Sequence, residues 1–138
     1  MNGKKFWISA LVVSVIYFFA GWLFYGILMA NVFMPENMPG SRPMPLVTFV
    51  ALSCLVYGLL MAFIYPYGYK GGDTTKEGMR FGILFALIVN LPAGLSMYAF
   101  LETYTVRALV IGTIWEVIIG AAMGIITAKV YGSTAKAA

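Results

Sequence analysis

Apolar residues run along the chain in four long stretches, separated by segments that hold most of the proline, glycine and charge. The stretches cover residues 6–30, 46–65, 79–101 and 106–130. Each has the roughly 20 residues that an α-helix needs to cross a hydrocarbon core of about 30 Å. Spans this long and this uniformly apolar do not suit the alternating strands of a barrel. The pattern predicts an all-α integral membrane protein: one domain over residues 1–138, with four transmembrane helices running up, down, up and down.

Composition and charge support this prediction. Of the 138 residues 62% are hydrophobic and 10% charged, too few charges to cover a water-soluble domain of this size. The basic residues flank the spans instead of forming a patch, which argues against a nucleic-acid partner.

The basic residues also predict the orientation of the chain in the membrane. Seven of the nine Lys and Arg fall on the side of both termini, and only Arg42 and Arg107 fall on the other. By the positive-inside rule we expect cytoplasmic termini, with the first span retained because it is too long for a cleaved signal.

Tyrosine and tryptophan residues lie near the ends of the predicted spans. Their amphipathic rings favour the headgroup region, so we interpret them as anchors at the membrane interface. This set comprises Trp7, Trp22, Tyr25, Tyr65, Tyr67, Tyr69, Tyr104 and Tyr131.

Small residues recur every four positions in the third and fourth predicted spans. Residues four apart form the ridges of helix packing, and small ones let two backbones come close inside lipid. We therefore predict that these two spans form a tight hairpin. The predicted packing residues are Gly82, Ala86 and Gly94 on the third span and Gly112, Gly120 and Gly124 on the fourth.

Asn90 and Glu116 are the strongly polar side chains deep within these spans. The tight turn between the spans centres near Thr103, so residues equally far from Thr103 should lie at similar depth. Asn90 lies thirteen residues before Thr103 and Glu116 thirteen residues after it. At a rise of 1.5 Å per residue both are roughly 15 to 18 Å from the nearest span end, close to the bilayer midplane. The same register pairs Gly94 with Gly112, Ala86 with Gly120, and Gly82 with Gly124.

A carboxylate at the bilayer centre costs several kcal/mol, so we expect Glu116 to be protonated, hydrogen-bonded, or both. One interpretation is a proton or cation site, with Asn90 orienting Glu116 and Tyr17 or Tyr57 supplying hydroxyl groups. The other interpretation is structural. A neutral Glu116 would then bond only to Asn90 or a partner helix and fix the register, for about 1 kcal/mol.

Other chemistry has little support in the sequence. Histidine is absent, Cys54 is the single cysteine, and no catalytic triad or paired carboxylates can be found, so we predict no enzyme activity, no cofactor and no metal site of the common kinds. Met34, Met38 and Met44 lie in the loop between the first two spans. Thioethers favour Cu(I), although methionines in such a loop more often rest on the interface.

Two short segments carry a resemblance. They are Gly21-Trp-Leu-Phe-Tyr-Gly-Ile-Leu, and Asn90-Leu-Pro-Ala-Gly-Leu-Ser-Met-Tyr-Ala together with Trp115-Glu116. With these motifs the chain resembles small four-span bacterial membrane proteins of unknown function. The resemblance implies a location in the bacterial inner membrane and implies no activity.

Three functions follow as hypotheses. The first is a non-enzymatic protein that acts through helix packing, as a homo-oligomer or an accessory subunit of a larger membrane assembly. It depends on small-residue faces left free, such as Cys54, Gly58 and Ala62 on the second span. The second is a small oligomeric transporter or channel that couples to protons or cations through Glu116. The third is a binder of lipid, quinone or pigment held against the aromatic first span.

Overall fold

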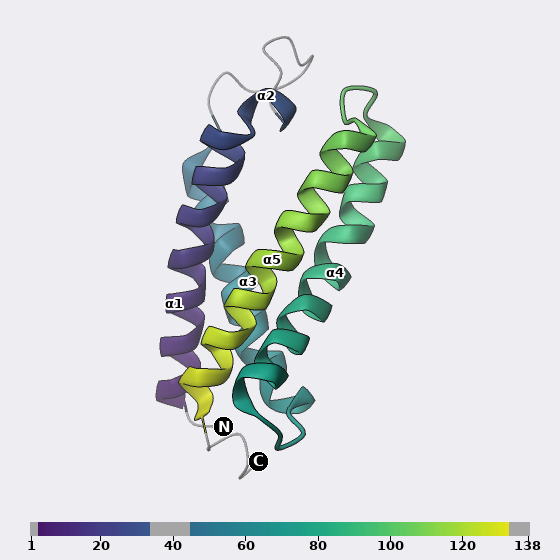
Figure 1. Cartoon of the computed structure of the whole chain (residues 1–138). Coiled ribbons are helices and arrows are strands. Elements are labelled where there is room, and N and C mark those ends of the chain that lie inside the picture. The colour runs from purple at the N-terminus through teal and green to yellow at the C-terminus, as the bar shows by residue number, and fades with distance from the viewer. Residues whose placement is uncertain (1–2, 34–44, 133–138) are drawn as a thin grey trace.

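The described part of the chain folds into four long helices and two short helical segments. The computed structural model describes residues 3–33 and 45–132, and these contain no strand. The elements are α1 (Gly3–Gly21), the π-helix η1 (Trp22–Leu28), α2 (Ala30–Phe33), α3 (Val47–Gly68), α4 (Thr74–Phe100) and α5 (Val106–Tyr131). The start of α1 and the end of α5 lie at one end of the bundle, which we call the terminal end, and the α4–α5 turn lies at the opposite end, the turn end (Figure 1).

Four helices in the described part of the chain are long and apolar enough to cross a membrane. This confirms the predicted all-α membrane class. The boundaries differ in places from the predicted ones. α4 begins at Thr74 rather than at residue 79, because the Asp73 side chain accepts a hydrogen bond from the Lys76 N–H at 2.8 Å and caps the helix. α3 continues past Pro66 to Gly68, and the first span changes from α to π geometry at Trp22.

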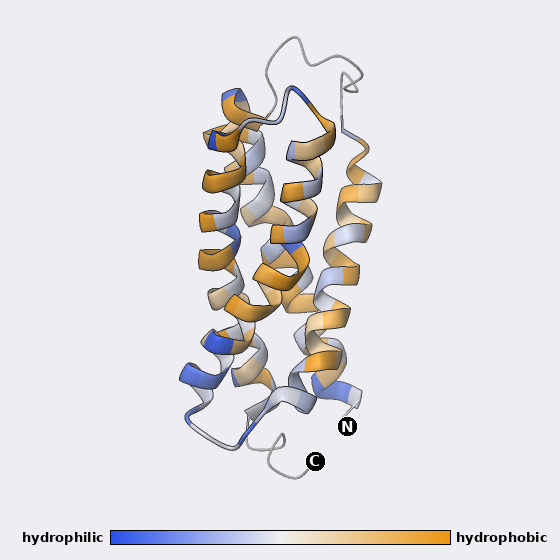
Figure 2. Cartoon of the chain, turned by 90° about the vertical axis from the view of Figure 1, so that its right-hand side faces the viewer, coloured by the Kyte–Doolittle hydropathy of each residue, from blue (hydrophilic) through white to orange (hydrophobic). Residues whose placement is uncertain are grey.

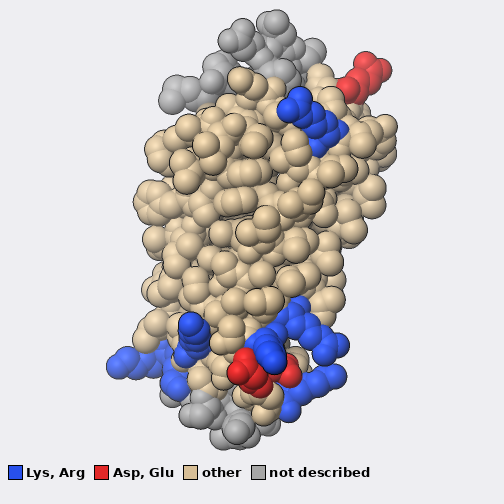
Figure 3. Space-filling model, viewed as in Figure 1, with Lys and Arg blue, Asp and Glu red and all other residues tan. Residues whose placement is uncertain are grey.

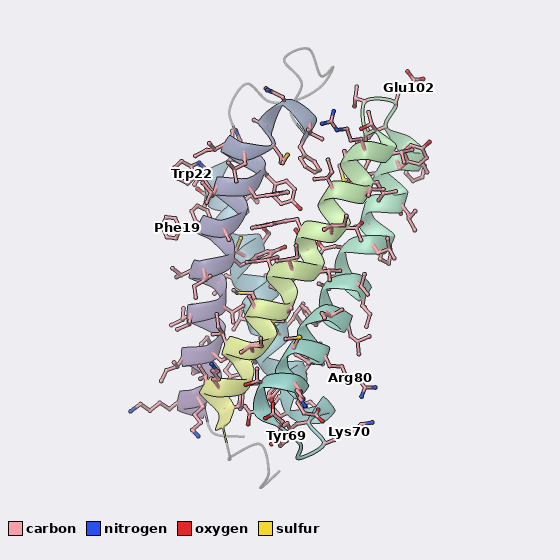
Figure 4. All side chains as sticks on the ribbon, in the orientation of Figure 1. Phe19, Trp22, Tyr69, Lys70, Arg80 and Glu102 are labelled. Atoms are coloured by element: carbon pink, nitrogen blue, oxygen red, sulfur yellow. The ribbon has the colours of Figure 1, made fainter. Side chains whose placement is uncertain are left out.

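The outer surface of the bundle is apolar along most of its length. Figure 2 shows hydrophobic residues along the helices and hydrophilic residues mainly near their ends. Phe19 and Trp22 point away from the bundle and are 59% and 60% exposed (Figure 4). Charged residues gather at the two ends of the molecule and leave an uncharged band between them (Figure 3). Such a surface indicates contact with a lipid bilayer.

The helices pack as two hairpins joined through α1 and α5. The interface between α4 and α5 is the most extensive, α1 packs against both α3 and α5, and α3 contacts α4 only slightly. At the terminal end the Tyr131 hydroxyl donates to the Ala62 carbonyl oxygen at 2.6 Å, and the Lys5 amine donates to the Tyr131 carbonyl oxygen at 3.0 Å. These bonds tie α1, α3 and α5 together.

The small-residue face of α3 is used inside the chain. Cys54, Gly58 and Ala62 are all buried, and a Cβ atom at Gly58 would lie 2.5 Å from the carbonyl oxygen of Ala10 on α1. The expectation that this face is free for association with another chain is therefore wrong. The spacing of small residues was interpreted correctly as a packing surface, but its partner is α1.

The aromatic residues predicted to lie at the membrane interface divide into exposed rings and buried ones. Trp7, Trp22 and Tyr67 are 57%, 60% and 76% exposed near helix ends. Tyr65 and Tyr131, in contrast, are 2% and 3% exposed and form part of the core. Position near a span end does not separate the two groups, because the face of the helix decides which rings turn inward.

Candidate functional site

The carboxyl group of Glu116 is the centre of a buried polar cluster. Glu116 lies on α5, ten residues after Val106, or about 15 Å along the helix from its start, and is 6% exposed. Its Oε1 accepts a hydrogen bond from the Tyr25 hydroxyl at 2.8 Å. Its Oε2 accepts one from the Tyr17 hydroxyl at 2.9 Å and one from the Asn90 side-chain amide at 3.2 Å. A single carboxyl group thus connects four elements, since the donors come from α1, η1 and α4.

The contact between Asn90 and Glu116 is the one that the register around Thr103 predicts. The Asn90 amide also donates to the carbonyl oxygen of Ala86, one turn earlier on α4, at 3.2 Å. This second bond orients the amide toward α5. All three donors to Glu116 are neutral groups, so the described hydrogen bonds stabilise a carboxyl group without supplying a positive charge.

Tyr57 does not donate a hydrogen bond to Glu116, as had been considered, but packs against Tyr17. Its ring stacks on that of Tyr17, with centroids 4.2 Å apart and an angle of 6° between the planes. Its hydroxyl is buried and has no hydrogen-bond partner among the described residues, so it does not bond to Glu116. Of the two tyrosines considered as hydroxyl donors, Tyr17 donates, whereas Tyr57 supports the Tyr17 ring.

Tyr25 was assigned to the membrane interface by sequence and belongs to the site instead. In an α-helix of 3.6 residues per turn, residues eight apart lie about 80° apart around the axis, so Tyr25 would not share the face of Tyr17. The π-helix η1 has a wider turn, shown by the bond from the Met29 N–H to the Phe24 carbonyl oxygen at 2.8 Å. Each residue then rotates the chain by less, which brings Tyr25 back toward Glu116. Apolar periodicity gives no sign of this change in helix geometry.

We call the interface between α4 and α5 the seam. On the terminal side of Glu116, backbone contacts close this seam. A Cβ atom at Gly82 would clash with the carbonyl oxygen of Gly120, and one at Gly124 would clash with that of Gly78. A Cβ atom at Gly120 would lie 2.6 Å from the Cβ atom of Ala86. We call this part of the seam the closed half. It matches the predicted packing of these residues.

On the turn side of Glu116, the seam contains a cavity of about 340 Å³. Here Gly94 and Gly112 line the same cavity, in keeping with their predicted equal depth, but their backbones are not in contact. A Cβ atom at Gly94 would first meet the Leu109 side chain at 2.8 Å, and one at Gly112 would first meet the Phe33 ring at 3.4 Å. Side chains enter between the helices and prevent the close backbone approach. We call this part the open half and its cavity the seam cavity.

Tyr104, in the α4–α5 turn, reaches into the open half. Its hydroxyl would lie 3.7 Å from a Cβ atom at Gly94 and 3.9 Å from one at Gly112. Partial burial raises the pKa of this phenol, so it stays protonated at neutral pH. The interpretation of Tyr104 as an interfacial anchor is therefore incomplete, because its polar end lines the seam cavity together with Tyr25 and Glu116.

A second cavity of about 230 Å³ lies on the other side of the polar cluster, between α1, α3 and α4. It is lined by Tyr17, Tyr57 and Asn90, and further by exposed apolar residues such as Val56 and Val89. Asn90 lines both cavities. The polar cluster thus separates two hollows in the bundle.

Chemically, the site offers one acid and several hydroxyl groups. Residues 3–33 and 45–132 contain no group of three or more His, Cys, Asp or Glu that could hold a metal ion. Met34, Met38 and Met44, the methionines considered for Cu(I), lie outside the described residues. No protein-family model, curated protein or solved structure matches the chain. Any functional interpretation therefore depends on the geometry around Glu116.

Proposed function

We propose that this protein is a non-enzymatic transporter of the bacterial inner membrane that binds a proton or another small cation at Glu116. One observation carries the proposal. A buried carboxyl group, held by Tyr17, Tyr25 and Asn90, lies at the wall of a cavity in the middle of an apolar bundle. Ionisable groups at such depth in membrane proteins are typical of ion and proton pathways.

The described hydrogen-bond donors to Glu116 are neutral, which favours a cation as a further ligand of its carboxylate. A charged carboxylate inside lipid costs several kcal/mol, and hydrogen bonds from neutral donors offset only part of this cost. An uncharged amide at position 116 could form a structural cross-link without that cost. The presence of an acid is therefore better explained by a site whose charge is neutralised when a cation or proton arrives.

The two halves of the seam favour a carrier over an open pore. The seam cavity extends from Glu116 toward Tyr104 and Phe33 at the turn end. In the closed half, glycine residues of α4 and α5 lie in backbone contact. A cation that reaches Glu116 from the turn end finds no continuous path along this seam, so passage to the other side requires the helices to move.

The orientation that we propose places the terminal end in the cytoplasm. Described Lys and Arg residues gather at that end (Figure 3). Arg107, in contrast, is the second residue of α5 and lies at the turn end. By the positive-inside rule the seam cavity then faces the outer side of the membrane. We infer that this structure corresponds to an outward-facing state.

The first of the three hypotheses, a role through helix packing alone, loses its main support. It depended on free small-residue faces, of which Cys54, Gly58 and Ala62 were the example, and that face packs against α1 within the chain. A homo-oligomer or a larger assembly remains a prediction. The described hydrogen bonds to Glu116 all come from side chains of the same chain.

The test is proton or cation flux into proteoliposomes that hold a pH-sensitive dye, driven by an imposed membrane potential. We expect wild-type protein to carry flux and Glu116→Gln to reduce it to the level of protein-free liposomes. Glu116→Asp, which keeps the carboxyl group, should retain part of the flux.

The matched control is Glu102→Gln, which removes a carboxyl group from the exposed α4–α5 turn (Figure 4). It should behave as wild type. Equal flux for wild type and Glu116→Gln, with both proteins folded, would contradict the proposal. So would the absence of wild-type flux under both proton and alkali-cation gradients.

A further inference from the structure

We propose that the seam cavity binds an organic cation, namely a primary ammonium group carried on a compact apolar or aromatic body. This inference rests on the proposed function and deepens it by naming the class of substrate. It comes from three features of the cavity: an open acceptor position on Glu116, further hydroxyl acceptors nearby, and a wall of aromatic rings.

The first feature is that the two carboxyl oxygens of Glu116 accept different numbers of described hydrogen bonds. A carboxylate offers about four acceptor positions, two on each oxygen. Among the described residues, Oε2 accepts from both Tyr17 and Asn90, whereas Oε1 accepts from Tyr25 alone. Tyr25 lines the seam cavity, and Tyr17 lines the second cavity. The unfilled position is therefore on Oε1, the oxygen bonded to Tyr25 beside the seam cavity.

The second feature is a set of acceptors suited to an ammonium group, which has three N–H donors. The Thr113 hydroxyl donates to the Leu109 carbonyl oxygen at 2.8 Å, so its own oxygen is free to accept. The Tyr104 hydroxyl also borders the cavity. A primary ammonium can bond to Glu116 and to these hydroxyl oxygens, whereas a bare alkali cation needs a fuller shell of oxygen ligands.

The third feature is the apolar wall. The volume of about 340 Å³ is at the lower end of the range for small-molecule sites. Rings of Tyr25, Phe33 and Tyr104 line it, and those of Tyr25 and Phe33 meet edge to face with centroids 4.9 Å apart. Aromatic faces attract cations, most strongly where water is excluded. The cavity thus fits a cation whose remainder is apolar and compact.

Protons and ammonium ions would compete for the same carboxyl group. The described titratable groups around Glu116 and its cavity are the Cys54 thiol and four phenols: Tyr17 on α1, Tyr25 on η1, Tyr57 on α3 and Tyr104 in the α4–α5 turn. α4 contributes Asn90, which does not titrate. The phenols and the thiol are neutral near pH 7, so within this set the negative charge belongs to Glu116 when its carboxyl group is deprotonated. Binding of one ammonium ion to a protonated Glu116 releases one proton, which is the exchange that a proton-coupled carrier needs.

The experiment is calorimetric titration of the full-length protein in lipid nanodiscs with phenethylammonium. The matched ligand is 2-phenylethanol, which has the same ring and chain but no charge. We expect the ammonium to bind and the alcohol to bind roughly tenfold or more weakly, since a charge-assisted bond is lost. The affinity for phenethylammonium should fall as the pH is lowered, and Glu116→Gln should abolish both the binding and its pH dependence.

Two variants test the location of the ligand. Gly112→Leu places a side chain in the seam cavity and should abolish phenethylammonium binding in the same titration. If Gly112→Leu does not fold, Thr113→Val decides, because it keeps the shape of the side chain and removes one acceptor. It should weaken phenethylammonium binding several-fold.

The inference is overturned if the alcohol binds as tightly as the ammonium, or if wild-type protein carries Glu116-dependent proton flux and binds no phenethylammonium. In the second case the proposed function stands. If Glu116→Gln leaves flux unchanged, the proposed function fails, and the substrate assignment fails with it.

Discussion

The closed and open halves of the α4–α5 seam start from the same sequence pattern and end in different structures. In the closed half, Gly82 and Gly120 bring two backbones into contact. In the open half, Gly94 and Gly112 keep the same spacing of four, yet they face side chains and a cavity of about 340 Å³. Glu116 lies where one half changes into the other.

The difference shows that small residues permit a close approach of helices but do not enforce it. In the open half, Tyr104 enters from the turn, Leu109 from α5 and Phe33 from α2. Each side chain occupies space that a second backbone would otherwise fill. As a result, Glu116 borders a cavity on the turn side of the seam and packed backbone on its terminal side.

The largest effect is expected from Gly120→Leu. A leucine side chain there would overlap the Cβ atom of Ala86 and the backbone of Gly82, so the two helices must separate. We expect the free energy of unfolding to fall by about 3 kcal/mol or more, measured by thermal unfolding in detergent. Ile118→Leu, at a position that is 59% exposed on the same helix, is the control. A Gly120→Leu protein as stable as this control would contradict the closed half.

A smaller but still clear loss is expected from Gly82→Ala. A single methyl group would clash with the carbonyl oxygen of Gly120, and backbone cannot move aside as a flexible side chain can. We expect a loss of about 1 to 3 kcal/mol in the same assay, despite the higher helix propensity of alanine. A gain in stability would show that the two backbones are further apart than described.

Much of this arrangement could be predicted from sequence. Bilayer thickness sets the length of the spans, so four long apolar stretches predicted four helices. The short turn around Thr103 fixes the relative depth of α4 and α5, and for this reason the contact between Asn90 and Glu116 follows from counting residues. The closed half follows from the same register.

The remainder depends on features that residue spacing does not encode. Tyr25 reaches Glu116 because η1 is π-helical, and no periodicity of apolar residues distinguishes π from α over seven residues. The seam cavity exists because side chains from the turn and from α2 enter the seam. The small-residue face of α3 packs on α1 rather than on another chain, and spacing alone identifies such a face without naming its partner.

The hydroxyl groups around Glu116 provide a matched pair of substitutions. Tyr25→Phe removes a bond of 2.8 Å to Glu116, whereas Tyr57→Phe removes a buried hydroxyl that has no described partner. We expect a loss of about 1 kcal/mol for Tyr25→Phe and no loss for Tyr57→Phe, measured by thermal unfolding. Equal losses would show that the Tyr25 bond contributes nothing specific.

The smallest effect is expected from Gly112→Ala in the open half. The new methyl group would meet the Phe33 ring at 3.4 Å, an ordinary contact, and alanine favours the helix by up to about 1 kcal/mol. We expect unchanged or slightly higher stability. A loss as large as that of Gly82→Ala would remove the distinction between the two halves.

The central claim is that Glu116 can be reached from the turn end and is sealed from the terminal end. The most direct measurement is the reaction of introduced cysteines with a small cationic thiol reagent, in a Cys54→Ser background, with the reagent applied to each side of sealed vesicles in turn. Thr113→Cys lines the seam cavity, and Met123→Cys replaces a residue that is 1% exposed on the terminal side of Glu116. We predict that Thr113→Cys reacts from the turn side alone and that Met123→Cys reacts from neither side. Equal reaction of both cysteines, or reaction of Thr113→Cys from the terminal side alone, would contradict the account.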